Sequence, residues 1–147
     1  MPGPVKSRAD AQITTLYVLT TGSGLGIWVH KNRVGQQYAV ALRAGVAVGP
    51  KGPLRPGFQF MAGATSWSSG SRCNGPWGGS RNKYLGLKFR IHGKSHFGWA
   101  RLNVDCKGPK LFGLLTGYAY ETIPGKSIIA GQTKGPDDAE AAASLDV

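Results

Sequence analysis

The segment that decides the fold runs Tyr84-Leu-Gly-Leu-Lys-Phe-Arg-Ile-His92, then Gly93-Lys94, then Ser95-His-Phe-Gly-Trp-Ala-Arg-Leu-Asn-Val104. Apolar and basic side chains alternate in its first part, which is the pattern of a half-buried β-strand. Gly93-Lys94 has turn chemistry and the last part returns as a partner strand, so the segment predicts a β-hairpin. We expect this hairpin to be central in the sheet, with Phe89 and Ile91 buried.

Further strand-like runs lie on both sides of this hairpin. Most are rich in β-branched or aromatic residues, and turn residues separate them, since the chain has 23 Gly and 9 Pro. We expect strands at residues 12–19, 27–30, 58–62, 111–120 and 127–130, a strand or a helix at 37–42, and loops at 49–57 and 66–80. The chain is therefore predicted to be all-β, either an antiparallel β-sandwich or an open barrel.

The length of 147 residues is that of one domain large enough to bury a core. We expect a flexible leader at residues 1–11, a single β domain at 12–133, and an acidic flexible tail at 134–147. No run of eighteen apolar residues is present, so no membrane span is expected. The start, MPGPVKSRAD, is not followed by an apolar h-region, and we expect no signal peptide in the sequence as given.

The charge is strongly positive and unevenly distributed. Residues 11–136 contain 16 Lys/Arg against two acids, whereas the last eleven residues contain four acids and no base. A basic body attracts polyanions such as nucleic acid or acidic polysaccharide. The candidate contacts, in which bases alternate with aromatic residues, are Arg81, Lys83, Lys88 and Arg90. The alternative is that these side chains form only the solvated side of an amphipathic strand.

Residues able to carry catalysis or hold a metal are scarce. His30, His92 and His96 have no Cys or carboxylate at ligand spacing. Glycoside hydrolysis needs two carboxylates across a cleft, whereas the basic body contains only Asp105 and Glu121, and we expect Glu121 to have a structural role. The Gly-x-Ser-x-Gly motif that presents a nucleophilic serine in α/β-hydrolases is also missing from the sequence. We expect a protein that is not an enzyme, with no catalytic residue, no cofactor and no metal.

The two cysteines, Cys73 and Cys106, are too few for a disulfide scaffold or a zinc site. They form either one bridge or two free thiols. Both flank the hairpin, one just before it and one just after it. We expect them to bridge if the protein is exported to an oxidising compartment.

Residues 76–136 carry a family resemblance. The matching segments are Pro76-Trp77, Arg81 to Phe89, His96 to Val104, Leu115-Thr-Gly-Tyr-Ala-Tyr-Glu-Thr-Ile-Pro124 and Ile128-Ile-Ala-Gly131. Together they resemble a β-module of uncharacterised secreted bacterial proteins of acidobacterial type, related to the domain that precedes PEP-CTERM sorting signals. The resemblance implies an exported β-sandwich-like domain, extracellular or at the cell surface, and implies no activity.

The resemblance singles out six residues: His96, Trp99, Arg101, Tyr118, Tyr120 and Glu121. They form either a binding face or, as we favour, a structural sheet pair in which the aromatic rings pack and Arg101 pairs with Glu121. Two functions remain open. One is a non-catalytic extracellular or cell-surface module with a structural or adhesive role, whose partners are cell-surface components. The other is a polyanion-binding β-domain. The oligomeric state stays open.

Overall fold

The structure, a computed structural model, describes residues 12–133 and 142–146, and within them every regular element is a β-strand. The predicted leader, 1–11, lies outside the described residues, as do 134–141 and 147 of the predicted tail. Residues Ala142–Asp146 of that tail form a strand, β12. The others are β1 Gln12–Leu19, β2 Gly26–Lys31, β3 Gln37–Ala39, β4 Ala47–Val48, β5 Leu54–Arg55, β6 Phe58–Trp67, β7 Gly70–Asn74, β8 Lys83–Ile91, β9 Lys94–Lys107, β10 Lys110–Glu121 and β11 Ile128–Ile129.

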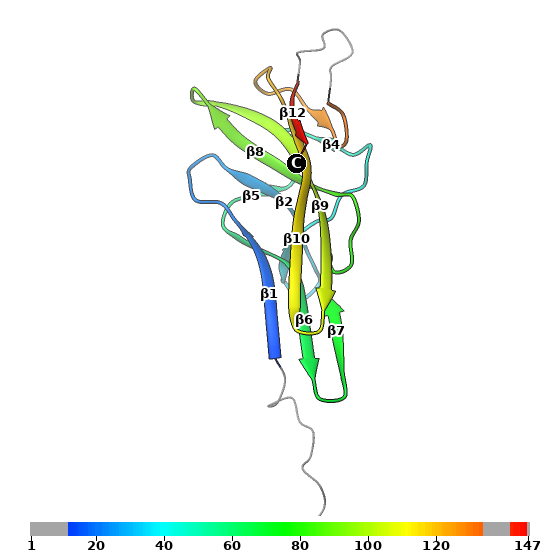
Figure 1. Cartoon of the computed structure of the whole chain (residues 1–147). Helices are drawn as coiled ribbons and strands as arrows, with labels where there is room; N and C mark the ends of the chain where they lie inside the picture. The colour runs from blue at the N-terminus through cyan, green and yellow to red at the C-terminus, as the bar shows by residue number, and fades with distance from the viewer. Residues whose placement is uncertain (1–11, 134–141, 147) are drawn as a thin grey trace, which may run out of the picture.

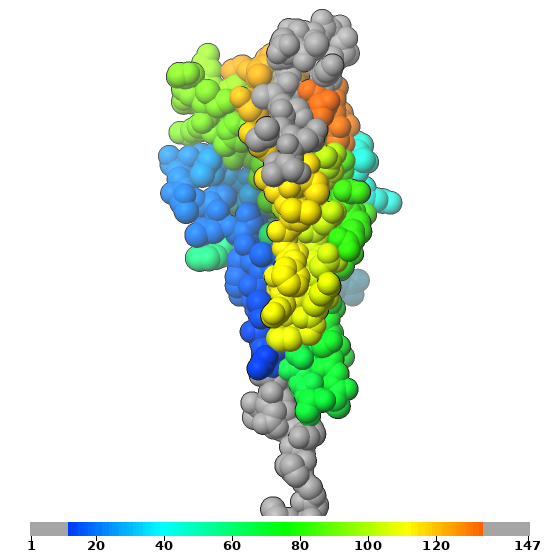
Figure 2. All heavy atoms as spheres, in the orientation of Figure 1, coloured from blue at the N-terminus to red at the C-terminus, as the bar shows by residue number. Residues whose placement is uncertain are grey.

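Ten of these strands form one strongly curved sheet, with the order β1-β6-β3-β2-β8-β9-β10-β12 (Figure 1). Strand β5 adds to β2, β7 adds to β6, and β4 with β11 makes a separate two-stranded sheet. The curvature brings β1 beside β10, where a Cβ on Gly113 would lie 3.8 Å from Leu16 Cδ2 (Figure 2). The prediction of an all-β fold, either a sandwich or an open barrel, is confirmed.

The predicted hairpin is central to this sheet. Strands β8 and β9 pair antiparallel from Lys83 opposite Leu102 to Ile91 opposite Lys94. The connection is the pair His92-Gly93, with φ of 51° and 76°. Positive φ at both positions is the signature of a type I′ turn, whose twist matches that of the flanking strands. The strand thus ends one residue earlier than the sequence predicts.

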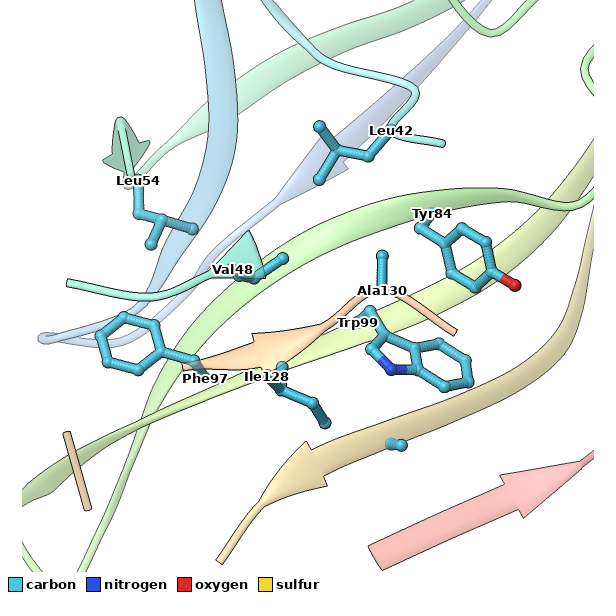
Figure 3. Close-up of a cluster of buried hydrophobic side chains, with 9 residues drawn as sticks. Leu42, Val48, Leu54, Tyr84, Phe97, Trp99, Ile128 and Ala130 are labelled. Carbon is cyan, nitrogen blue, oxygen red and sulfur yellow. The ribbon is translucent and has the colours of Figure 1, made fainter. Parts of the chain in front are cut away.

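Two hydrophobic cores lie on opposite faces of this hairpin. On one face, Trp99 and Phe97 pack with Tyr84 under the small β4–β11 sheet, as Figure 3 shows. On the other face, Leu85 and Val104 pack inside the curved main sheet with Trp77, Met61 and Ile27. Side chains alternate between the two faces of a strand, so a strand that is buried on both faces contributes side chains to both cores.

Three sequence expectations need correction. Phe89 and Ile91 are half-buried rather than core, because the core inside the curved sheet extends only as far as Leu87 on that face of β8. The expected loop at 66–80 contains strand β7, which pairs with β6 from Gly63 opposite Asn74 to Trp67 opposite Gly70. The expected loop at 49–57 contains strand β5, which pairs with β2. For residues 37–42, where the sequence left strand and helix open, the structure has strand β3 at the start.

Gly98 on β9 is a site where added volume should be costly. A Cβ there would lie 2.7 Å from the Ala119 carbonyl oxygen and 2.9 Å from Tyr120 Cβ, and neither backbone can retreat without breaking the β9–β10 ladder. We expect Gly98→Ala to lower the free energy of unfolding by about 1–3 kcal/mol, the usual penalty of overpacking. Urea denaturation measures this. Gly113→Ala on β10 is the control and should change little; equal losses would contradict the argument.

Candidate functional site

The residues singled out by the resemblance lie on strands β9 and β10, and Trp99 is the most buried of them. Its side chain is fully inaccessible to solvent. The indole Nε1–H donates to the Gln132 carbonyl oxygen at 3.0 Å, and the ring meets Tyr84 edge-on, with centroids 5.1 Å apart. A buried indole N–H with a partner and an edge-to-face ring contact is a packing arrangement. Trp99 is therefore a core residue and presents no face to a ligand.

Arg101 is not placed to pair with Glu121, and that expectation is wrong. Tyr120 lies opposite Gly98, so Glu121 is about 13 Å along the strands from Arg101. Arg101 instead donates from Nε to Thr116 Oγ1 at 2.9 Å and from a terminal nitrogen to the Thr116 carbonyl oxygen at 3.1 Å. Thr116 sits where the β9–β10 register shifts, between Leu115 and Gly117. Arg101 thus donates a hydrogen bond to the backbone of a β-bulge, where the hydrogen bonds between the two strands are interrupted.

Glu121 and His96 are joined at the other end of the same strand pair. Glu121 is 3% exposed; its Oε1 accepts from the Ile123 backbone N–H at 3.2 Å. His96 Nδ1 lies 2.8 Å from the Glu121 carbonyl oxygen, and because a carbonyl only accepts, Nδ1 carries the proton. Phe89 stacks on the His96 ring and meets Tyr120 edge-on, and Tyr118 is half-buried. These contacts are those of a structural cluster.

Cys73 and Cys106 form a disulfide, the first of the two alternatives left open by the sequence. Cys73 is in β7 and Cys106 is in β9, with Cα atoms 5.7 Å apart. The bond joins the β6–β7 hairpin to the β9–β10 hairpin, which extend side by side at one end of the molecule (Figure 1). It therefore cross-links two regions of the curved sheet that no hydrogen-bond ladder among the described strands connects directly.

The four candidate polyanion contacts do not form one cluster. Arg81 is held by Asp105, with a nitrogen–oxygen distance of 2.7 Å. Lys83 begins β8, and Lys88 lies about 16 Å further along the same strand. Lys88 and Arg90 share one face of β8, because they are two residues apart. The structure thus separates Arg81 and Lys83 from Lys88 and Arg90.

Lys88 lines a groove of about 290 Å³ beside the loop between β4 and β5. Arg55 and Ser95 contribute the other polar side chains, and Pro50, Leu54 and Phe97 contribute apolar surface. The groove contains no acidic side chain in its lining. It brings Lys88 together with Arg55, a base that the sequence analysis did not single out.

A second hollow, of about 500 Å³, lies on the N-terminal half of the sheet. Three aromatic rings line it, from Tyr17 in β1, Phe60 in β6 and Tyr38 in β3. Three carboxamide side chains, those of Asn32, Gln36 and Gln37, complete its polar lining. We call this hollow the aromatic cleft. The sequence analysis selected none of these residues, since their strands are brought together only by pairing across the sheet.

The described residues hold no group of three or more His, Cys, Asp or Glu side chains arranged to bind a metal ion. No helix in that part of the chain is long and apolar enough to cross a membrane. In comparisons with protein-family models, with curated proteins and with solved structures, nothing matches this chain. The resemblance to the secreted β-module stays a prediction.

Proposed function

We propose that this protein is a disulfide-stabilised extracellular or cell-surface module that acts by binding, in an adhesive or structural role, rather than by catalysis. The observation that carries this proposal is the Cys73–Cys106 disulfide. Disulfides persist in oxidising environments and are rare where glutathione and thioredoxin keep thiols reduced. The residues that the resemblance singles out have packing roles on β9 and β10. The candidate binding sites are therefore the grooves on the surface of the sheet.

The compartment can be tested through the redox state of the cysteines in the native source. We expect both cysteines to resist alkylation when cells are lysed in a thiol-trapping reagent, and to become alkylatable only after reduction. Mass spectrometry of the peptides that contain Cys73 and Cys106 reads the result. Two alkylated thiols before reduction would overturn the extracellular proposal.

A second candidate function, polyanion binding, is supported by the basic groove of Arg55 and Lys88. Two cations that line one hollow with Ser95, and no acid among the lining residues, suit a phosphate, sulfate or carboxylate group. The net charge of +11 would steer polyanions to the surface.

For this candidate we expect salt-dependent retention on a heparin column, because counterion release makes such binding fall steeply with salt. The double variant Arg55→Gln, Lys88→Gln should elute at clearly lower salt than the parent protein. Arg33→Gln, Arg72→Gln removes the same charge at exposed positions outside the groove and is the control. Equal shifts for both pairs would show diffuse attraction without a groove site. No retention even at low salt would remove the candidate.

A further inference from the structure

The rings of the aromatic cleft belong to a row that crosses four strands. Tyr17 pairs with Phe60, Phe60 with Tyr38, and Tyr38 with His30. Residues directly opposite one another in a sheet project from the same face, so these four rings share one face. Tyr17 is 53% exposed, which is high for a large aromatic side chain.

That face is the outer one. Val18 and Ala39, the sequence neighbours of Tyr17 and Tyr38, pack in the core inside the curved sheet. Their alternation turns the rings away from the core. Tyr17 meets Phe60 edge-on, with centroids 6.2 Å apart, and His30 meets Tyr38 at 5.5 Å. The rings therefore form a supported platform over which a ligand can lie.

The first polar wall of the cleft is a pair of amides with fixed orientations. Asn32 Oδ1 accepts from the Val34 and Gln36 backbone N–H groups, at 3.1 and 2.9 Å, which identifies the oxygen. Asn32 Nδ2 then donates to Gln36 Oε1 at 2.9 Å. No hydrogen bond within residues 12–133 uses the Gln36 Nε2 group, which stays available as a donor.

The second polar wall of the cleft is the side chain of Gln37, which a buried residue, Gln59, holds in a fixed orientation. Gln59 is 1% exposed and donates from Nε2 to the Pro56 carbonyl oxygen at 2.9 Å. Its Oε1 must therefore accept, and it does so from Gln37 Nε2 at 3.0 Å. This leaves Gln37 Oε1, for which the described residues provide no donor, as an acceptor. Gln59 is a positioning residue, and the cleft offers one directed donor and one directed acceptor.

The loop that closes one side of the cleft is also held in place. Pro76 lines the cleft, and the next residue, Trp77, is fully buried. Trp77 donates from Nε1 to the Ala39 carbonyl oxygen at 3.1 Å and from its backbone to the Met61 carbonyl oxygen at 3.0 Å. Gly75, at φ 91°, allows this loop close to the Phe60 ring, because a Cβ there would lie 2.8 Å from Phe60 Cε2. A cleft with fixed walls loses little entropy on binding.

From this geometry we propose that the aromatic cleft binds a neutral saccharide segment, an inference that rests on the proposed role as a surface-binding module. The apolar C–H face of a sugar ring packs against aromatic rings, and its hydroxyls both donate and accept, which matches Gln36 and Gln37. The cleft, at about 500 Å³, is of the size of small-ligand sites, roughly 300–1,000 Å³. No charged residue lines it, although the chain carries +11. A charged ligand would therefore find its partners elsewhere on the surface.

The test titrates the full chain with four neutral oligosaccharides: cellohexaose, xylohexaose, maltohexaose and chitohexaose. Isothermal calorimetry measures the dissociation constant, and we expect at least one to bind. Tyr17→Ala should weaken that binding by about tenfold, the scale of one hot-spot contact. Phe112→Ala is the control, because Phe112 is an exposed ring, 50% accessible, on β10 and outside the cleft. Gln59→Leu should weaken binding through the orientation of Gln37, so combining it with Gln37→Ala should weaken binding no further than Gln37→Ala alone does.

The thermal midpoint of each variant confirms that it is folded before its affinity is compared. Saccharide binding should also be insensitive to salt, unlike retention on heparin. Binding to none of the four probes, or equal affinity for the Tyr17→Ala and Phe112→Ala variants, would overturn the proposal. So would concentration-dependent dimerisation that Tyr17→Ala abolishes, because the face would then be covered by a second copy. The thiol-trapping experiment reads the proposed compartment independently of all these outcomes.

Discussion

Replacing Trp99 with Ala should lower the free energy of unfolding by about 3–5 kcal/mol, the cost of removing a large aromatic side chain from a packed core. Trp99 is fully buried between the β8–β10 face and the small β4–β11 sheet (Figure 3). The substitution removes the edge-to-face contact with Tyr84 and the hydrogen bond to Gln132. It also opens a cavity that the surrounding strands, held by their ladders, cannot fill.

Equilibrium urea denaturation followed by far-ultraviolet circular dichroism measures this loss. Small domains have only about 5–15 kcal/mol of total stability, so Trp99→Phe, which keeps a ring, should be studied in parallel. Phe112→Ala is the matched control, since that ring is half-exposed on β10, and surface changes cost about 0.5 kcal/mol or less. Comparable losses for Trp99→Ala and Phe112→Ala would show that the layer over Trp99 is not a stabilising core.

Removing the disulfide should have the second large effect. The bond closes a loop of 33 residues, and the chain-entropy model assigns such a loop about 3–4 kcal/mol of stability. The double variant Cys73→Ala, Cys106→Ala should therefore unfold at much lower urea concentration than the oxidised parent. The physical reason is that the linked unfolded chain has fewer conformations than the open one.

Reduction gives an independent measurement of the same bond. The parent protein in reductant should fall to nearly the stability of the double variant, and reductant should leave the double variant unchanged. A parent protein whose thiols become alkylatable with no loss of stability would contradict the expected contribution. Each single variant would leave the other cysteine as a free, reactive thiol, so the single variants are not suitable substitutes for the double variant.

The alternation of residues 84–91 and the turn chemistry after them were sufficient to predict the hairpin, because period-two patterning and a two-residue turn are local signals. They were not sufficient to predict how deeply each residue is buried. Phe89 fits the pattern as well as Leu85 does, yet Leu85 is core and Phe89 is half-buried. The difference depends on how far along β8 the core inside the curved sheet extends, and the side chains that form this core come from distant segments of the chain.

For the candidate site residues too, the sequence predicted some of the features that the structure shows and not others. In the sequence, Cys73 lies just before the hairpin and Cys106 just after it, and in the structure the two form a disulfide. Sequence neighbourhood also suggested one basic surface through Arg81, Lys83, Lys88 and Arg90. The length of β8 separates those four, and Arg81 is held by Asp105. Opposite charges on adjacent strands suggested an ion pair between Arg101 and Glu121. The register of β9 and β10 instead brings Arg101 to Thr116, to which it donates hydrogen bonds.

By itself the sequence determined what short-range chemistry determines: an all-β chain, a central hairpin, turns at Gly and Pro, and a strongly basic body. Only the tertiary structure decided which strands become neighbours. Tyr17, Tyr38 and Phe60 are distant in the chain and meet because β1, β6 and β3 are adjacent in the sheet. Strand register is set by burial and pairing over the whole sheet, so a cleft built across three strands leaves no local signal in any one of them.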